Sequence, residues 1–525
     1  MGGILYALGF PTNSMPVLFI FSIIGMSLFL YSLEIVSTTS EQKIFNRIKK
    51  TLFFSLGYCL TGYYWIPYTI SEFGDIPFPL NWILGVFFSL IIAPQFFVFL
   101  FSLGIIKKVQ LISPKLYGLL TQKSVYPIIL AFLLTFFEYY TPQQFPAHLG
   151  HPWIQITPYL GLAPIFGAAI YSFLSYLIAL TICLYFSTKK VHKINLIIII
   201  VLIFSNLLIP LNKEINNNGY KTNIRLVQAN VGNFLKISAE GGSFQAIEEI
   251  IGDYYELSTA SSEAPIDLII WPETAYPHLL SSKRMEKNKD TIPKVFKDTI
   301  FETKAELFVG GYDLNTIKRT SFESEFNTAF HFDSNANLKN VYHKMKLIPF
   351  GENLPFGFFN QYLSKMIKNI SFFASGTNYT LFKTKNDAPF ISGICYEILF
   401  SSFIRDYLNN TPEQASFMIN LTNDSWYGDT SEPHQHLALA KWRAIEFNLP
   451  IVRMTNTGIT SLIYADGSES KRLNVGEKKH LDITLQSQRR KKTFFQRVGF
   501  LSISLLVFLL VGIAHLLGRK TNLML

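Results

Sequence analysis

Three side chains that can act together on a carbonyl group each follow a short apolar segment of this 525-residue chain. Glu273 comes after "IDLIIWP", Lys344 ends "NTAFHFDSNANLKNVYHK", and Cys395 comes after "PFISGI". A thiol attacks a carbonyl carbon as a thiolate, so it needs a base and a nearby positive charge. We expect Glu273 to accept the thiol proton and Lys344 to stabilise both the thiolate and the oxyanion that its attack creates.

Each of these residues also has an ordinary structural interpretation. A buried cysteine is usually a small apolar side chain, a glutamate after Trp-Pro can be a loop carboxylate, and Lys344 can be a solvated hairpin residue. Spacing alone does not choose between the interpretations. The other two cysteines, Cys59 and Cys183, lie in long apolar runs, and no CxxC spacing predicts a metal cluster or a disulfide framework.

The segments that must position these side chains are predicted to be alternating strands and helices. Short apolar segments typical of strands include "NIRLVQANV", "ELFVGGYD", "ASFMINLTND" and "IVRMTNTG". Ser243 can cap a helix that begins "FQAIEEII", and "HQHLALAKWRAIEF" has helical spacing. The alternation predicts a layered α/β domain over 220–487, joined to the preceding residues by the linker "INNNG" at 215–219.

The rest of the chain has the composition of a membrane protein. The whole chain has a mean hydropathy of +0.26 and only 16% charged residues, which favours membrane helices outside the α/β domain over a second soluble domain. We predict a transmembrane helix bundle over 1–211 and a C-terminal transmembrane helix over 497–517. Residues 1–14 are open to forming a further span. The apolar runs within the bundle are 16–36, 52–70, 81–106, 125–139, 162–186 and 194–211.

The net charge of +10 could indicate a nucleic-acid partner, but the basic residues follow a membrane pattern instead. When every run counts as a span, basic residues fill the loops on one side, whereas the loops at 71–80 and 140–161 on the other side contain no Lys or Arg. The positive-inside rule then places the basic loops in the cytoplasm and residues 212–496 outside. The basic cluster at 489–492 lies on that outer side, where it can meet anionic lipid headgroups.

Six motifs, three of which contain Glu273, Lys344 and Cys395, resemble those of the apolipoprotein N-acyltransferases, the membrane-anchored branch of the nitrilase superfamily. They occur in one order over about 190 residues and are "IIWPETAYP", "YHKMKLIPFGENLPF", "GICYE", "LTNDSWYG", "PHQHLALAKWRAIE" and "TNTGIT". The resemblance covers essentially the whole chain. It implies a nitrilase-like α-β-β-α sandwich between a multi-helix membrane bundle and one last helix.

The resemblance also implies residue roles. It assigns Glu273, Lys344 and Cys395 to the family's Glu-Lys-Cys triad. Lys346 competes with Lys344, but the family places the lysine eight residues before the glutamate of "PFGE" and so selects Lys344. The supporting residues that it implies are Glu352 in "PFGE" and Tyr396 and Glu397 in "CYE".

Glu352 can equally be a hydrogen-bonded turn residue, whereas Tyr396 and Glu397 are expected to orient the loop that carries the nucleophile. The chain departs from the family at Ile237, where a tryptophan usually follows a Leu-Lys pair, so the role of this position stays open. It also has "WPE" for Trp-Ser-Glu and "TNTG" for Thr-Asn-Asn-Gly, and neither change removes a member of the triad.

The activity implied by the resemblance is the last step of lipoprotein maturation. A fatty acyl chain would move from a phospholipid, through a thioester on the cysteine, to the α-amino group of an apolipoprotein's N-terminal diacylglyceryl-cysteine. The expected partners are a phospholipid donor, the diacylglyceryl-modified apolipoprotein and membrane lipid, without cofactor, metal or nucleic acid. The expected location is the bacterial cytoplasmic (inner) membrane, with several spans and the catalytic domain on the periplasmic side.

Two other functions compete with this hypothesis. A membrane-tethered amidase of the nitrilase type would use the same triad with water as the acceptor, although a soluble substrate would not require such a large bundle. A transporter would place ionisable residues deep inside its spans, whereas Glu34 and Glu138 lie near the ends of their runs. Two apolar segments, "FGFFNQYL" at 356–363 and "SFFASG" at 371–376, are either lipid-facing loops or ordinary core.

Overall fold

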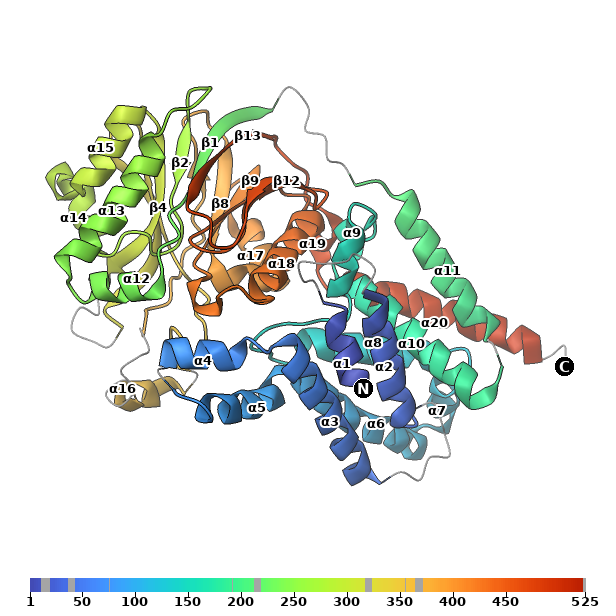
Figure 1. The fold of residues 1–525 in the computed structure, drawn as a ribbon. Helices are drawn as coiled ribbons and strands as arrows, with labels where there is room; N and C mark the ends of the chain where they lie inside the picture. Colours follow the sequence, from blue (N-terminus) through green and yellow to red (C-terminus); the bar gives the residue numbers. More distant parts are fainter. Residues whose placement is uncertain are drawn as a thin grey trace. The chain divides into compact units, whose positions relative to one another are not determined.

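The computed structural model describes residues 1–10, 19–35, 43–74, 76–190, 192–211, 219–316, 323–354, 356–363 and 372–522. The chain divides into two compact units (Figure 1). The first comprises Met1–Leu211 with Thr493–Leu525, and the second comprises Asn212–Lys492. Residues 215–218 of the predicted linker lie outside the described residues.

Two β-sheets form the centre of the second unit. In the first sheet the strand order is β13-β1-β2-β4-β5-β6, and β3 pairs with β4. Its strands are β1 (Tyr220–Gln228), β2 (Leu268–Ile270), β3 (Leu279–Leu280), β4 (Glu306–Leu314), β5 (Glu325–Phe332), β6 (Leu338–His343) and β13 (Lys479–Ser487). The second sheet has the order β12-β11-β10-β9-β8-β7. Its strands are β7 (Phe382–Lys383), β8 (Pro389–Ile394), β9 (Phe417–Thr422), β10 (Ile451–Thr455), β11 (Thr460–Ile463) and β12 (Glu469–Leu473).

Helices cover these sheets, and the sheets pack on each other through aromatic rings. The ring of Phe308 on β4 lies 5.5 Å from that of Phe390 on β8, whereas Trp271 and Phe296 pack in the core beneath the helices of the first sheet. Figure 1 shows α12 to α15 beside β2 and β4. The α-helices of this unit are α12 (Asn233–Glu240), α13 (Phe244–Thr259), α14 (Ser282–Lys287), α15 (Lys294–Thr303), α16 (Asn360–Leu363), α17 (Ser401–Asn410) and α18 (Glu432–Phe447). Its 3₁₀ helices are η2 (Lys289–Thr291), η3 (Gly357–Phe359), η4 (Cys395–Leu399) and η5 (Ser425–Tyr427).

The predicted layered α/β domain is therefore confirmed, and several local predictions hold with it. The Ser243 hydroxyl accepts a hydrogen bond from Ala246 N and caps α13. The stretch that was expected to form a hairpin is the antiparallel pair β5 and β6, with Lys344 directly after its second strand. Strands β1, β2 and β4 pair in parallel, as do β8, β9 and β10, so their carboxyl ends meet at the sheet edges.

The first unit is helical. Its helices are α1 (Gly2–Leu8), α2 (Phe19–Ser32), α3 (Ile44–Gly62), α4 (Ile66–Gly74), α5 (Leu80–Ile92), α6 (Pro94–Ile112), α7 (Pro114–Leu120), α8 (Tyr126–Tyr140), η1 (His151–Ile156), α9 (Ala163–Phe166), α10 (Ala169–Thr188), α11 (Lys193–Leu208), α19 (Phe494–Val498) and α20 (Leu501–Asn522). Four apolar runs that the sequence presents as continuous are each divided between two helices. At the 81–106 run the cause is Pro94, which lacks an N–H and starts α6. At two other runs the cause is a glycine with positive φ, since Gly167 ends α9 and Gly499 ends α19.

Length and hydropathy mark two of the described helices as able to cross a membrane. They are Ala169–Thr188 and Leu501–Gly518, each close to the roughly 20 residues that a bilayer core requires. Four shorter apolar helices accompany them, at Phe19–Ser32, Pro94–Leu103, Tyr126–Tyr140 and Lys193–Leu208. Residues 1–10 comprise α1 and the residues on either side of it. Residues 11–14 lie outside the described residues.

Candidate active site

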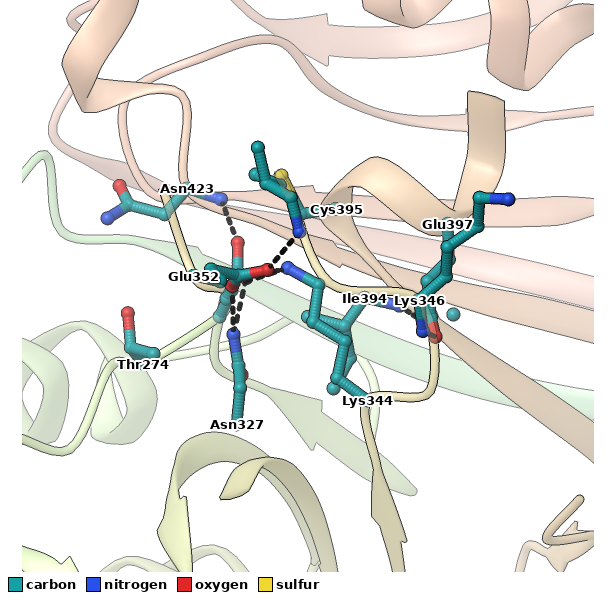
Figure 2. Close-up of polar contacts among 12 residues, drawn as sticks. Thr274, Asn327, Lys344, Lys346, Glu352, Ile394, Cys395, Glu397 and Asn423 are labelled. Atoms are coloured by element: carbon teal, nitrogen blue, oxygen red, sulfur yellow. Dashed lines mark hydrogen bonds and ion pairs between the residues drawn. The ribbon is translucent and has the colours of Figure 1, made fainter. Parts of the chain in front are cut away.

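A buried lysine between two carboxylates forms the centre of the candidate site. The Lys344 Nζ lies 3.1 Å from Glu273 Oε1 and 2.7 Å from Glu352 Oε1, and Lys344 is completely buried. Glu273 follows β2 and Lys344 follows β6, so the two strand ends meet here. In Figure 2 the side chains of Lys344 and Asn327 point toward Glu352, with Cys395 beside them.

The carboxylate of Glu273 is held from several directions. Asn327 Nδ2 on β5 donates to Glu273 Oε1 at 2.8 Å and to Glu352 Oε1 at 3.1 Å. The backbone N–H of Asn423, just after β9, donates to Glu273 Oε2 at 2.9 Å. Both oxygens of the expected base are thus oriented by the protein before any substrate binds.

Gly310 allows the Glu273 segment to approach β4. A Cβ atom at Gly310 would lie 2.3 Å from Pro272 O and 2.7 Å from Glu273 Cα, closer than nonbonded carbon atoms come in proteins. Any other residue at this position would therefore displace the backbone at Pro272 and Glu273. The first glycine of "ELFVGGYD" is therefore required because a side chain would not fit there.

Cys395 lies in a sharp turn at the end of β8. It is the first residue of η4, and its φ of +48° is a left-handed conformation that non-glycine residues seldom adopt. The thiol is nearly buried, and His436 Nε2 lies 3.3 Å from the Cys395 carbonyl oxygen. Strained backbone of this kind is found where a side chain must be presented for chemistry.

Glu397 connects this turn to the segment that follows Lys344. Its Oε1 accepts hydrogen bonds from the N–H groups of Met345 and Lys346 at 2.7 and 3.0 Å, and its Oε2 accepts one from Ile394 N at 2.8 Å. The Tyr342 hydroxyl on β6 adds a contact of 2.9 Å. A single buried carboxylate thus fixes the position of the Cys395 turn relative to the segment after β6.

The remaining candidates lie around this centre. Glu352 also accepts a hydrogen bond from Ile348 N at 2.9 Å, so it is both a turn residue and a partner of Lys344. The ring of Tyr396 packs against that of Phe400, with 4.9 Å between centroids. Lys346 points elsewhere, because its Nζ lies 3.7 Å from the centroid of the Phe400 ring.

Charges at the site act in opposite directions on the thiol and the lysine. Burial raises the pKa of Cys395 well above its usual value, and Glu273 raises it further, whereas Lys344 lowers it. Burial lowers the pKa of Lys344, but Glu273 and Glu352 outweigh that effect and raise it above the usual lysine value. Lys344 is therefore a permanent cation, and the resting thiol needs a base at the moment of attack.

The sequence did not single out several residues that the structure brings to the site. Asn327 and Asn423 both orient Glu273. Asn327 begins the segment that ends at Lys344, and Asn423 lies in "LTNDSWYG", but neither was predicted to be a functional residue. Lys236, in "QANVGNFLKI", is 8% exposed and donates a hydrogen bond to Thr274 Oγ1, next to Glu273 in the chain. The neighbouring Ile237 is 54% exposed.

A second buried polar cluster lies next to Cys395. Asp424 Oδ2 accepts a hydrogen bond from Arg453 Nη2 at 2.9 Å, and Asp424 Oδ1 lies 3.2 Å from His436 Nδ1. Asp424, Glu432 and His436 have ligand-type atoms within 4.8 Å of one another. A metal cation there would lie against the Arg453 guanidinium, so the donor set fits a side-chain network better than a metal site.

The two apolar segments that were open to a lipid-facing or a core interpretation differ from each other. Phe356, Phe358 and Phe359 are 49%, 70% and 54% exposed, so core packing is wrong for this part of 356–363. Phe372 and Phe373 are buried and belong to the core. Ser371, the first residue of the second segment, lies outside the described residues.

Comparisons with known proteins match both units. Residues 223–491 match the carbon-nitrogen hydrolase family, and residues 2–181 match the apolipoprotein N-acyltransferase N-terminal domain. The apolipoprotein N-acyltransferase of Haemophilus ducreyi is 28% identical over 477 residues, which cover 88% of this chain and 86% of that protein. That of Bdellovibrio bacteriovorus is 29% identical over 424 residues, covering 78% and 74%. That of Haemophilus influenzae is 25% identical over 523 residues, covering 94% and 91%.

The buried Glu397 carboxyl predicts a specific pH dependence of stability. Burial raises its pKa from 4.5 to about 7. A carboxyl whose pKa is higher in the folded state stabilises the fold fully below its unfolded pKa and loses that contribution as the pH rises through the folded value. Between about pH 5 and pH 8, we expect the unfolding free energy of the wild type to fall by up to about 3 kcal/mol relative to Glu397→Gln, which cannot titrate.

This prediction is measured by thermal or denaturant unfolding of the detergent-solubilised protein at a series of pH values. The exposed Glu249 on α13 provides a control, since Glu249→Gln should keep the wild-type slope. Parallel pH profiles for the wild type and Glu397→Gln would contradict the prediction.

Proposed function

Because the chain belongs to the carbon-nitrogen hydrolase family and is an N-acyltransferase that acts on apolipoproteins, we propose that its acyl transfer proceeds through a thioester on Cys395. The observation that supports this proposal most is the buried Lys344 ammonium, placed between Glu273 and Glu352 where it also acts on the thiol. These are the parts that a cysteine nucleophile needs: a base and a fixed positive charge.

In the first half-reaction, Glu273 accepts the proton from the Cys395 thiol as its sulfur attacks the ester carbonyl of a phospholipid. Lys344 stabilises the negative charge that develops on the carbonyl oxygen. The bond between the carbonyl carbon and the glyceryl oxygen then breaks, and Glu273 returns its proton to that oxygen. Lysophospholipid leaves, and the acyl chain remains as a thioester on Cys395.

In the second half-reaction, the α-amino group of the apolipoprotein's diacylglyceryl-cysteine attacks the thioester carbonyl. Glu273 accepts a proton from the attacking nitrogen, the carbon–sulfur bond breaks, and an amide forms. Glu273 returns that proton to the thiolate that leaves, so the enzyme returns to its initial state. Splitting the transfer into two steps allows the same three side chains to serve both substrates in turn.

A membrane-tethered amidase would use this triad with water as the acceptor. The match of residues 2–181 to the N-terminal domain of apolipoprotein N-acyltransferases favours the lipid reaction, because both of its substrates carry acyl chains that stay in a bilayer. Exposed aromatic side chains at 356–363 also suit a catalytic unit that works at a lipid surface. Water that reached the thioester would hydrolyse it, so its exclusion is part of the proposed mechanism.

The proposed location is the bacterial inner membrane, with several spans in the first unit and the catalytic unit on the periplasmic side. Its support is the segregation of basic loops together with the apolar helices of the first unit. Loops near Lys190 would then face the cytoplasm, and the exposed loop at Glu263 would face the periplasm.

Removal of the proposed base should slow both half-reactions. We expect Glu273→Gln to slow lysophospholipid release and N-acylation of a diacylglyceryl peptide by about 10²–10⁴-fold, since the amide cannot accept the thiol proton. Chromatography of the products after incubation with phospholipid, with and without the peptide, measures the two steps. Glu249→Gln serves as the matched control, and a Glu273→Gln enzyme that kept wild-type rates would assign the base to another group.

The proposed topology can be tested by labelling intact cells with a membrane-impermeant maleimide. We expect Glu263→Cys to be labelled from outside and Lys190→Cys to react only after the inner membrane is permeabilised. Labelling is done in a Cys395→Ala background, because Cys395 is the proposed nucleophile, and the two remaining native cysteines, Cys59 and Cys183, are buried. Labelling of Lys190→Cys in intact cells, with protection of Glu263→Cys, would reverse the proposed orientation.

A further inference from the structure

The helix α12 is oriented contrary to the usual rule for amphipathic helices. Its lysine, Lys236, is buried at 8% exposure, whereas its apolar residues Phe234 and Ile237 are 86% and 54% exposed. Burial of an ammonium group is unfavourable unless the protein supplies compensating charges or hydrogen bonds. The inward orientation of Lys236 therefore requires a reason other than packing.

The surroundings of Lys236 belong to the candidate site. Its Nζ donates to Thr274 Oγ1, and Thr274 has a left-handed φ of +48° directly after Glu273. Lys236, Glu273 and Thr274 line one small cavity together with Asn456. The nearest carboxylate, Glu240 Oε1, is 4.0 Å from Nζ, and its side chain is 36% exposed. Glu240 also receives a hydrogen bond from the Tyr312 hydroxyl.

The fixed charges around Cys395 show what Lys236 contributes. Asp424 is neutralised by Arg453 at 2.9 Å. Lys344, in contrast, is shared by two carboxylates and can neutralise only one of them. Without another cation this cluster would carry one excess negative charge, which opposes both a thiolate and an oxyanion.

Other groups near the thiol do not supply the missing charge. Burial lowers the pKa of His436 and favours its neutral form. Burial likewise favours the neutral forms of the nearby acidic groups by raising the pKa values of Tyr396, Tyr427, Glu432 and, on the other side of Glu240, Tyr312. Burial also lowers the pKa of Lys236, while Glu240, Glu273, Glu352 and Cys395 counteract that shift.

We propose that Lys236 is a positioning residue of the acyl-transfer site, whose buried ammonium balances the second carboxylate of the Glu273–Lys344–Glu352 cluster and so favours thiolate formation at Cys395. Solvent screens the partly exposed Glu240, so the charge of Lys236 acts mainly toward the site. Thr274 holds the ammonium in place. This inference rests on the proposed function, because it assigns a role to the same nucleophile.

The test compares the reactivity of Cys395 with and without this charge. The rate of Cys395 alkylation by iodoacetamide is followed across pH by peptide mass spectrometry in the wild type, Lys236→Met and Lys236→Arg. We expect Lys236→Met to raise the pH midpoint by about one unit and to slow alkylation about tenfold below it. Lys236→Arg should restore most of the difference. The exposed Lys287 gives the control, since Lys287→Met should behave as the wild type.

Acylation by phospholipid and by a neutral p-nitrophenyl ester is measured with the same variants, after a thermal melt has verified that they fold. Lys236→Met should slow acylation by both donors to a similar extent. An unchanged alkylation midpoint with a raised KM for phospholipid alone would make Lys236 a phosphate-binding residue and overturn the proposal. If wild-type Cys395 forms no acyl-enzyme at all, the proposed function fails. An unaltered midpoint in an enzyme that still acylates Cys395 removes only the inference about Lys236.

Discussion

The buried ion cluster of Lys344 with Glu273 and Glu352 is the interaction on which the rest of the catalytic unit depends. An ammonium group without solvent is tolerated only beside compensating charges, and here two carboxylates meet it at 3.1 and 2.7 Å. Removal of Lys344 would leave two carboxylates in the interior without their shared cation. The ends of β2 and β6 and the turn at 348–352 are therefore held together by electrostatics as well as by packing.

The neighbouring contacts also fix the position of Cys395, the proposed nucleophile. Glu397 accepts hydrogen bonds from the residues after Lys344 and from Ile394, just before Cys395. The left-handed backbone of Cys395 is held between this carboxylate and the His436 contact to its carbonyl. The proposed chemistry would thus use a preformed constellation, in which proton transfer moves little besides the proton itself.

Much of this organisation could be predicted from local sequence patterns. Strand ends with polar residues, the Ser243 cap and the β5–β6 hairpin are local features, and each was recognisable from a few neighbouring residues. The selection of Lys344 over Lys346 came from family spacing, and the structure gives its physical counterpart: Lys346 lies over Phe400 rather than against the carboxylates. The resemblance, rather than spacing alone, predicted a catalytic role for Cys395.

What could not be predicted depends on contacts between distant segments. Asn327 and the Asn423 backbone reach Glu273 only after two sheets have formed, and neither residue differs locally from an ordinary polar side chain. A lysine in a helix is expected on its solvent-exposed face, yet Lys236 is buried in the fold. The apolar runs of the first unit looked continuous because they are uniformly apolar, whereas single residues divide the helices: Pro94 starts α6 and Gly167 ends α9.

The measurement that tests the central claim most directly is the intact mass of the purified protein after incubation with phospholipid and no amine acceptor. The account predicts an increase equal to one fatty acyl chain, with release of one equivalent of lysophospholipid. It also predicts that the adduct is absent from Cys395→Ala. An unmodified wild-type protein beside intact phospholipid, or an equal adduct on Cys395→Ala, would contradict the assignment of Cys395 as the acyl carrier.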